Sequence, residues 1–341
     1  MTTEKEMPMP DSGQPVVAVF TLGGTIAMLR TPDGGATPAL SASDLLAAVP
    51  GLDSVGVSLQ VQDVVNKPGA SLTFPDLSDL VEAINGALAD GCAGAVVTQG
   101  TDTIEETSYL LDLLVSSDAP VVVTGAMRNP SLAGPDGPAN LKAAILVAAS
   151  EAARELGCLV VMNDQVHAAR WVQKSHSTSP AAFVSPNHGP VGHVVEDRVD
   201  IPILIRHRPP HVAADLSRPV RVGLVTMTFG DDGTLAEAIG EHVSGLVVAG
   251  FGVGHVPVEA VPVLAKLATR MPVILASRTG SGPVHRGTYG FPGSEQDLLT
   301  RGLISAGYLP PVKARLLLHL LLTAGADQTQ ITETFSRAGG E

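Results

Sequence analysis

The chain has few cysteines, few aromatic residues and no long apolar run. Its 341 residues include two cysteines, Cys92 and Cys158, and only 3% aromatic residues. The two cysteines lie in separate apolar stretches, so we expect two buried thiols and no structural disulfide. Scarce aromatic rings argue against a surface that stacks on nucleic-acid bases. No uncharged apolar run is long enough to cross a bilayer, so we expect no membrane partner.

Positive charge is scarce as well. The 21 Lys and Arg residues are outnumbered by 34 Asp and Glu residues, which gives a formal net charge of −13 at pH 7. This balance argues against binding to the phosphate backbone of nucleic acids and to anionic membranes. Residues 1–14 are polar and contain no apolar core of a signal peptide. We therefore expect a flexible tail over 1–14 and a cytoplasmic protein.

Several motifs of well-known sites are missing. The ten histidines are scattered, without His-Glu-x-x-His or Cys/His ligand spacing, so no metal is expected. Complete Rossmann and P-loop glycine patterns are also absent, as is the Gly-x-Ser-x-Gly nucleophile turn. The sequence thus predicts no cofactor.

What the chain has is an alternation of apolar runs and helix-like segments, with 45% hydrophobic residues overall. Such alternation predicts an α/β fold with a parallel sheet. The segment Ile203–Pro219 interrupts the pattern with two adjacent prolines, and we interpret it as a linker. The expected domains are therefore a larger one over 15–202 and a smaller one over 220–341, the latter ending in an amphipathic helix over Lys313–Thr323.

Glycine and small polar residues follow several predicted strands. Thr25 comes after Gly23-Gly24, and Thr101 and Asp102 come after Gln99-Gly100. Ligands bind outside the carboxyl ends of the strands in open parallel sheets, so these residues are candidates for a site. Thr103 and Glu106 also fit a capping box, which leaves Asp102 a second interpretation as an ordinary helix-start residue.

A threonine acts as a nucleophile only when another group accepts its proton. Lys174 is the candidate acceptor, because burial at a sheet edge lowers the pKa of a lysine. The alternative is a lysine fully solvated on the surface.

Five ordered motifs resemble the bacterial-type L-asparaginases. Two are the signatures Leu22–Ala27 and Thr98–Thr107, and three further stretches support them, namely Thr124–Arg128, Asp136–Leu141 and Val161–Asp164. The resemblance implies a larger, flavodoxin-like N-terminal domain, a smaller C-terminal α/β domain, and a homodimer or homotetramer. It also implies hydrolysis of L-asparagine to L-aspartate and ammonia through a threonine acyl-enzyme.

The resemblance implies a role for each matching residue. Thr25 corresponds to the nucleophile, Thr101 and Lys174 to a proton-relay pair, and Asp102 to the group that binds the substrate α-amino group. Ser71 corresponds to the residue that binds the substrate carboxylate, with Ala70 as the other possible alignment, and Ala126 to the residue whose backbone contacts the substrate amide.

Two positions depart from the family pattern. The loop Arg30–Leu40 lacks the tyrosine that the family usually carries there, and the chain's only tyrosines are Tyr109, Tyr289 and Tyr308. Gln99 stands where many members have histidine. Two other functions therefore stay open, a glutamine-preferring or tRNA-amidotransferase-associated amidohydrolase, and a weakly active regulatory homologue that binds an amino acid.

Overall fold

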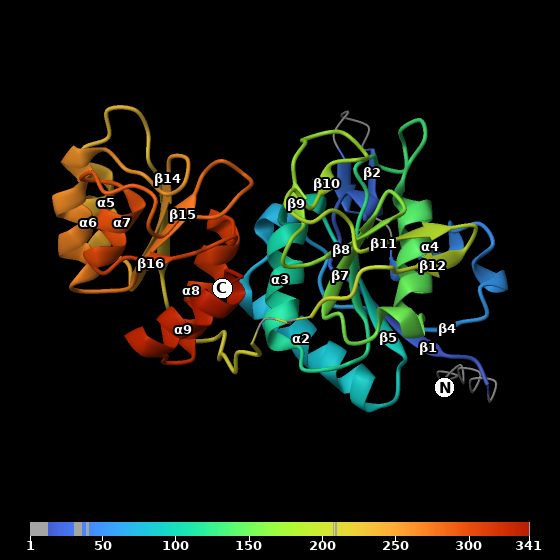
Figure 1. Ribbon diagram of the computed structural model, residues 1–341. Coiled ribbons are helices and arrows are strands. Elements are labelled where there is room, and N and C mark those ends of the chain that lie inside the picture. Colours follow the sequence, from blue (N-terminus) through green and yellow to red (C-terminus); the bar gives the residue numbers. More distant parts are fainter. Residues whose placement is uncertain (1–12, 31–35, 39–40, 207, 209, 341) are drawn as a thin grey trace.

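The computed structural model of the protein describes residues 13–30, 36–38, 41–206, 208 and 210–340. Figure 1 shows two α/β units side by side, the larger one N-terminal and the smaller one C-terminal. The strands of the larger sheet are β1 (Val16–Thr21), β4 (Ser58–Asp63), β5 (Gly94–Thr98), β6 (Val121–Thr124), β7 (Cys158–Met162), β8 (Gln165–Ala168), β11 (Gly192–Val195) and β12 (Arg198–Asp200). Two short pairs lie outside it, β2 (Met28–Arg30) with β3 (Ala36–Pro38), and β9 (Gln173–Lys174) with β10 (Phe183–Val184).

The strand order of the larger sheet is β12-β11-β8-β7-β6-β5-β1-β4. Strands β4, β1, β5, β6 and β7 pair in parallel. Counted along the chain, these five follow the order 2-1-3-4-5, which is the flavodoxin-like arrangement. The predicted fold class is confirmed, and the switch point of the sheet lies between β1 and β5.

Three antiparallel strands extend this sheet, and the sequence did not predict them. A two-residue turn joins β7 to β8, with Asn163 at φ 53° and Asp164 at φ 60°. Two successive positive φ angles are typical of a type I′ hairpin, and Asn and Asp tolerate them best after glycine. The stretch Val161–Asp164 therefore ends in a tight hairpin and not in a loop to a helix.

Helices cover both faces of the larger sheet. On one face α1 (Ala42–Ala47) and α4 (Gly137–Ala148) pack against the side of β1 that carries Val17 and Val19. On the other, α2 (Phe74–Ala89) and α3 (Ile104–Leu114) pack against Ala18 and Phe20. A strand buried on both faces is apolar throughout, which explains the continuous apolar run of β1.

The smaller sheet is entirely parallel, in the order β13 (Val222–Thr226), β14 (Gly245–Gly250), β15 (Val273–Ser277), β16 (Ile304–Ser305). Helices α5 (Thr234–Gly240), α6 (Val261–Ala268) and α7 (Glu295–Thr300) contribute to the apolar cluster on one of its faces. Helices α8 (Pro311–Thr323) and α9 (Gln328–Ala338) contribute to the cluster on the other face.

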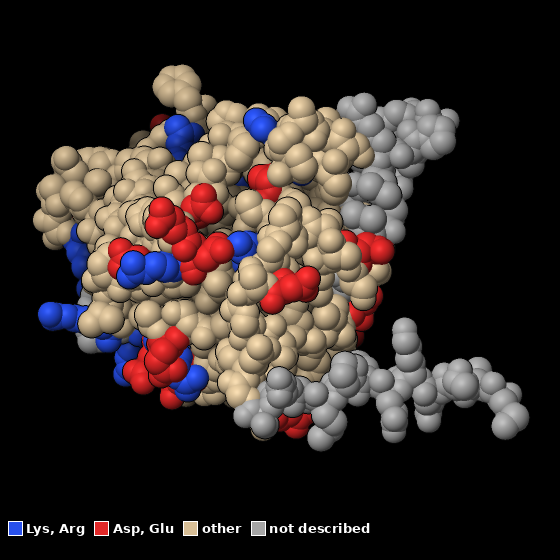
Figure 2. All heavy atoms as spheres, turned by 90° about the vertical axis from the view of Figure 1, so that its right-hand side faces the viewer, with Lys and Arg blue, Asp and Glu red and all other residues tan. Residues whose placement is uncertain are grey.

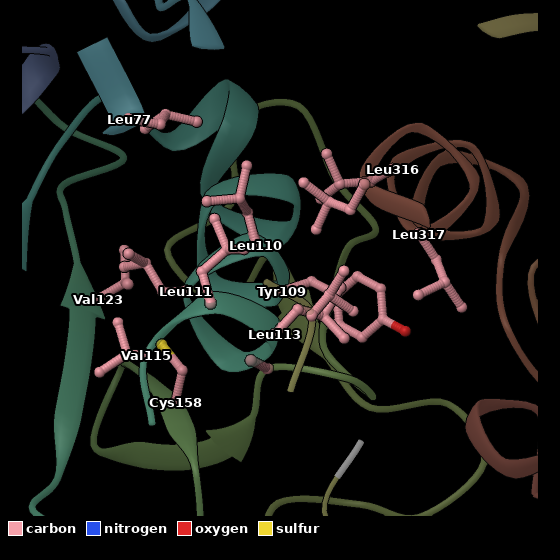
Figure 3. Close-up of a cluster of buried hydrophobic side chains, with 14 of the residues drawn as sticks. Leu77, Tyr109, Leu110, Leu111, Leu113, Val115, Val123, Cys158, Leu316 and Leu317 are labelled. Carbon is pink, nitrogen blue, oxygen red and sulfur yellow. The ribbon is translucent and has the colours of Figure 1, made fainter. Parts of the chain in front are cut away.

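Helix α8 joins the two units. It lies between the smaller sheet and α3, and Leu316 and Leu317 approach the side of α3 that carries Tyr109 and Leu110 (Figure 3). Residues on almost every side of α8 are buried, as expected of a helix that is apolar all round. The prediction of a terminal amphipathic helix at Lys313–Thr323 was therefore wrong in two respects, because α8 is enclosed and α9 follows it.

Other predictions have mixed outcomes. Cys92 and Cys158 are both free and buried, as expected. Within the described residues of 203–219 the chain forms no helix or strand, and its assignment as a linker stays a prediction. The predicted tail, apart from residues 13 and 14, and residues 31–35 and 39–40 of the loop Arg30–Leu40 lie outside the described residues. Among the helices that the structure describes, none is both long enough and apolar enough to span a bilayer.

Candidate active site

Four parallel strands end in register at one edge of the larger sheet. Thr21 of β1 pairs with Asp63 of β4 and with Thr98 of β5, and Thr98 pairs in turn with Thr124 of β6. The segments that follow these strands therefore emerge side by side. They carry Thr25, Ser71, Thr101 with Asp102, and Ala126.

Three of these segments meet through glycines. A Cβ atom placed on Gly24 would lie 2.0 Å from the backbone nitrogen of Gly100, and one on Gly69 would lie 2.8 Å from the Gly100 carbonyl oxygen. Gly24 also has a φ of +87°, a region that side chains disfavour. Only glycine permits this approach, and it places the residues that follow, Thr25 and Thr101, on adjacent segments.

Thr25 begins a single 3-10 turn, Thr25–Ala27, directly after the two glycines. The backbone N–H of Ala27 closes the turn by donating to the carbonyl of Gly24 at 2.9 Å. Ile26 and Ala27 point into the core, whereas Thr25 is partly exposed. The turn therefore presents the Thr25 hydroxyl at the sheet edge while its neighbours anchor it.

Lys174 joins the second threonine to the neighbouring carboxylate. Its Nζ donates to Thr101 Oγ1 at 3.0 Å and to Asp102 Oδ1 at 2.8 Å. The Lys174 side chain is only 15% exposed, whereas that of Asp102 is 68% exposed. A lysine so enclosed and paired does not fit the fully solvated alternative. The ion pair leaves the outer side of Asp102 open to a ligand cation.

The predicted capping box at Thr103 and Glu106 is absent. Thr103 is the N-cap of α3 but makes no side-chain capping bond, and its hydroxyl instead donates to the carbonyl of Gly69 at 3.1 Å. The single 3-10 turn Thr101–Thr103 precedes the helix. Thr103 does not cap the helix because its hydroxyl donates to the Gly69 carbonyl and accepts from Gln99 Nε2, which takes the place of a helix N–H.

Glu105 ties the strand of Lys174 to α3. Its carboxylate accepts a hydrogen bond from the backbone N–H of Lys174, and burial raises the pKa of Glu105. The sequence analysis did not identify Glu105 as part of the site. Its acidic side chain at the start of α3 also suits the helix dipole.

Gln99 is a buried support beneath the glycine contact. Its Nε2 donates to the Gly100 carbonyl and to Thr103 Oγ1, both at 3.2 Å. The side chain is 0% exposed. Gln99 therefore holds the turn that carries Thr101 and Asp102 from inside.

Two side chains at the start of α4 shape the segment around Ala126. The Asp136 carboxylate accepts from the backbone N–H groups of Met127 at 3.0 Å and Arg128 at 2.8 Å. Asn140 donates to the Gly125 carbonyl at 3.0 Å. Ala126 itself is 1% exposed, so its contribution to a site would come from its backbone.

Ser71 ends the 3-10 turn Gly69–Ser71 and its side chain is exposed. The turn is the one that packs on Gly100, so Ser71 lies on a segment that adjoins Thr101 and Asp102. The predicted set thus gathers at one sheet edge, with Lys174 reaching it from β9.

Of the tyrosines, Tyr109 is 0% exposed and lies on α3, where it contributes to the core beside α8 (Figure 3). Tyr289 and Tyr308 belong to the smaller unit and are 44% and 45% exposed. Among the described residues, no group of three or more His, Cys, Asp or Glu side chains is arranged to hold a metal ion.

Sequence reasoning missed Lys313, a fully buried lysine at the start of α8. Its Nζ donates to the carbonyls of Ala169 at 2.6 Å and Val172 at 2.5 Å, in the segment that leads to Lys174. The only signal was a lysine in a helix rich in leucine, and together with Arg315 it fits a residue on a solvated face equally well.

Comparison with known proteins agrees with this arrangement. Residues 16–203 match the family model described as the N-terminal asparaginase domain, and residues 221–335 match the C-terminal domain of glutaminases and asparaginases. The chain belongs to the asparaginase family. The matches fall on the same two parts of the chain as the two sheets.

Individual relatives extend over nearly the whole chain. A probable L-asparaginase of Deinococcus radiodurans is 36% identical over 95% of this chain and 98% of its own. L-asparaginase 2 of Escherichia coli is 33% identical over 95% of this chain and 93% of its own. The crystal structure of a probable cytoplasmic L-asparaginase from Campylobacter jejuni superposes with a TM-score of 0.84 at 32% identity, over 95% of this chain and 100% of that one.

Proposed function

We propose that this asparaginase-family protein is an amidohydrolase that converts L-asparagine and water to L-aspartate and ammonia. The observation that carries the proposal is the contact of Lys174 Nζ with both Thr101 Oγ1 and Asp102 Oδ1, at the edge where Gly24 meets Gly100. This contact brings a hydroxyl, a carboxylate and an amine that can transfer a proton to the sheet edge that also carries Thr25.

Each residue of the set has a proposed role. The Thr25 hydroxyl attacks the side-chain amide carbon, ammonia leaves, and water then hydrolyses the threonine ester to release aspartate. Lys174 donates to the Thr101 oxygen, which leaves the Thr101 hydroxyl hydrogen free to point toward the substrate. As the Thr25 oxygen bonds the amide carbon, the Thr25 hydroxyl proton passes through this pair to the amide nitrogen, which leaves as ammonia.

Substrate recognition is assigned to the outer residues. Asp102 is 68% exposed and takes the α-amino group, while Ser71 donates to the α-carboxylate. The segment at Ala126, held by Asp136 and Asn140, offers its backbone to the substrate amide. A backbone donor aimed at the developing oxyanion contributes about 3 kcal/mol in comparable sites.

We further propose a cytoplasmic homodimer or homotetramer without a cofactor. Support for the compartment comes from the C. jejuni relative, a probable cytoplasmic L-asparaginase. The alternatives, a glutamine-preferring or tRNA-amidotransferase-associated enzyme and a weakly active regulatory homologue, are not favoured, because the relatives above are named L-asparaginases over nearly their full lengths.

The test is ammonia release measured separately with L-asparagine, L-glutamine and D-asparagine. We expect the highest kcat/KM with L-asparagine, and Thr25→Ala to abolish it while the far-UV circular dichroism spectrum stays unchanged. Faster turnover of glutamine would support the second function, and no turnover of any amide by the wild-type protein would rule out an enzyme. A Thr25→Ala variant that keeps most of its activity would refute the assignment of the nucleophile.

A further inference from the structure

A cavity lies between the two units, and its described lining does not include Thr25 or Lys174. It has a volume of about 720 Å³ and its lining comes from three parts of the chain. These are the segment before β9 with the nearby Asn187 and His188, the connecting residues 204–206 with Arg208, and the C-terminal residues around Tyr308 and the end of α9. The volume is typical of a pocket for a small organic molecule.

The charge of this cavity contrasts with that of the whole chain. Four arginines line it, Arg170, Arg206, Arg208 and Arg337, and no Asp or Glu belongs to its described lining. The chain as a whole has a formal charge of −13. On the face of the larger unit shown in Figure 2, by comparison, acidic and basic side chains are interspersed.

Two of the arginines, Arg208 and Arg170, already interact with groups of the protein itself. Arg208 Nη1 donates to the Ser117 carbonyl at 3.1 Å and lies 3.8 Å from the Asp118 carboxylate. Arg170 is close enough to the buried Asp112 for the two charges to interact. Within the described part of the chain, Arg206 and Arg337 are exposed and form no ion pair, so their guanidinium groups are available to an anion.

Aromatic rings make one wall of the cavity rigid. The Trp171 indole stacks on the His188 imidazole, with centroids 4.1 Å apart and planes 8° apart. The Tyr308 ring contacts the same His188 imidazole edge-on, with centroids 6.2 Å apart. Fixed rings beside flexible arginine side chains shape a pocket that is preorganised on one side, which lowers the entropic cost of binding.

We propose that this cavity binds a small molecule with at least two negative charges on phosphoryl or carboxylate oxygens, held by the guanidinium groups of Arg206 and Arg337 with Arg170 and Arg208. Guanidinium is planar, permanently charged and able to donate two parallel hydrogen bonds to such oxygens. A single chloride ion would leave most of these donors unused, whereas a pyrophosphate or a tricarboxylate engages several at once. The inference does not depend on which amide the enzyme hydrolyses.

The chain offers a direct reporter for this binding, because Trp171 is its only tryptophan and lines the cavity. We would titrate the full-length protein with pyrophosphate, citrate and ATP, and with sodium chloride at matched ionic strength, while following tryptophan emission. We expect a saturable change with at least one multivalent anion and none with chloride. Comparison of pyrophosphate and ATP with citrate distinguishes a phosphate-bearing ligand from a polycarboxylate.

Variants establish where the anion binds. Arg206→Gln/Arg337→Gln removes two exposed charges without cutting a buried contact, and we expect it to weaken binding at least about tenfold, because two guanidinium groups that donate to the anion are lost. Arg270→Gln, at the surface after α6, is the matched control and should bind as the wild type does. Equal affinities in all three proteins, or no saturable response to any anion, would overturn the proposal, including the case in which a second copy of the chain covers the cavity.

Discussion

At the scale of single residues, Lys174 makes two contacts that serve different purposes. The ion pair with Asp102 orders the carboxylate, and the bond to Thr101 Oγ1 orients the hydroxyl. We predict that Lys174→Met lowers kcat for ammonia release at least about 100-fold, the range of proton transfer by a positioned side chain. The measurement is steady-state ammonia release together with thermal unfolding.

Lys142→Met is the control for this prediction. Lys142 Nζ forms another lysine–aspartate ion pair, at 2.7 Å from Oδ2 of Asp197, the residue before β12 in the larger unit. Exposed pairs of this type contribute about 0–1 kcal/mol, so stability should change little and kcat not at all. If Lys174→Met kept the wild-type kcat, the relay role of Lys174 would be wrong.

Gly24 provides a second test at this scale. Gly24 (φ +87°) and Gly91 (φ +97°) share a left-handed backbone, but a Cβ on Gly24 would lie 2.0 Å from Gly100 N, whereas one on Gly91 meets nothing within 4 Å. We expect Gly91→Ala to reduce the free energy of unfolding by about 1–2 kcal/mol through its backbone alone. Gly24→Ala should reduce it further and abolish turnover, as urea unfolding and ammonia release would show. If both variants lost the same free energy of unfolding and the same activity, the close approach of Gly24 to Gly100 would contribute nothing beyond the backbone effect.

These residue-level features differ in how well the sequence predicts them. Double glycines and Thr-Asp after apolar strands mark the edge of a parallel sheet, so the position of Thr25, Thr101 and Asp102 at that edge was predictable. The hydrogen bonds that support the site were not predictable. Examples are the bond from Gln99 to Thr103 and the bond from Lys313 to the Ala169 carbonyl. Such contacts depend on side-chain directions across the fold, which local spacing does not encode.

At the scale of elements, α8 connects the smaller unit to the segment that carries Lys174. Lys313, 0% exposed, donates from α8 to the carbonyls of Ala169 and Val172. We predict that Lys313→Met lowers the free energy of unfolding by about 2–5 kcal/mol, because two buried carbonyls lose their donor. Turnover should fall as well, since residues 169–174 lose their attachment. Arg315→Met is the control, because Arg315 lies two residues further along α8 and its Nε donates to the Val222 carbonyl at 3.0 Å. It tests whether the loss of any cationic residue of α8 has this effect.

The same lysine predicts a dependence of stability on pH. Burial lowers the pKa of Lys313 from 10.5 to about 7, although Glu105 and Asp112 favour its charged form. Between these two values the unfolded chain holds a proton that the folded chain lacks, so the folded state gains stability as pH rises. We expect the wild-type free energy of unfolding to rise relative to that of Lys313→Met by up to about 1.4 kcal/mol per pH unit above pH 7. Urea unfolding of both proteins at several pH values measures this difference, and parallel curves would contradict it.

At the scale of the whole molecule, the sequence predicted the parallel α/β architecture better than the antiparallel extension of the sheet and the contact between the two units. The apolar runs of β1 and β5 to β7 and their alternation with helices identify a parallel α/β sheet, because strands buried on both faces have no polar alternation. The antiparallel strands β8, β11 and β12 have only three or four residues each, and polar residues such as Gln165 and His167 interrupt even the largely buried β8, so none of them forms a continuous apolar run. The contact between the two units was also unpredictable, since the apolar sides of α8 do not reveal which unit each one faces.

His319 at that contact predicts how the molecule responds to acid. It is 3% exposed on α8 and stacks on Phe74 of α2, with centroids 3.9 Å apart and planes 5° apart. Burial lowers the pKa of His319 to about 4. An unfolded histidine takes up its proton near pH 6.5, so the folded state loses stability as pH falls from about 6.5 toward 4. His319→Phe keeps a flat ring against Phe74 and removes this titration.

We therefore expect His319→Phe to change the free energy of unfolding by less than about 1.5 kcal/mol at pH 8, as volume-conserving swaps do. Between pH 6.5 and 4 it should lose stability less steeply than the wild type. His167→Gln is the comparison, because burial also lowers the pKa of His167 to about 4, but its ring bonds Ser185 Oγ at 3.0 Å and Gln165 Oε1 at 3.1 Å. In His167→Gln the free energy of unfolding should also fall less steeply with acid than in the wild type. It should nevertheless be lower at pH 8, because removal of the imidazole removes both hydrogen bonds. An acid response of His319→Phe identical to that of the wild type would show that the α8–α2 contact does not sense pH.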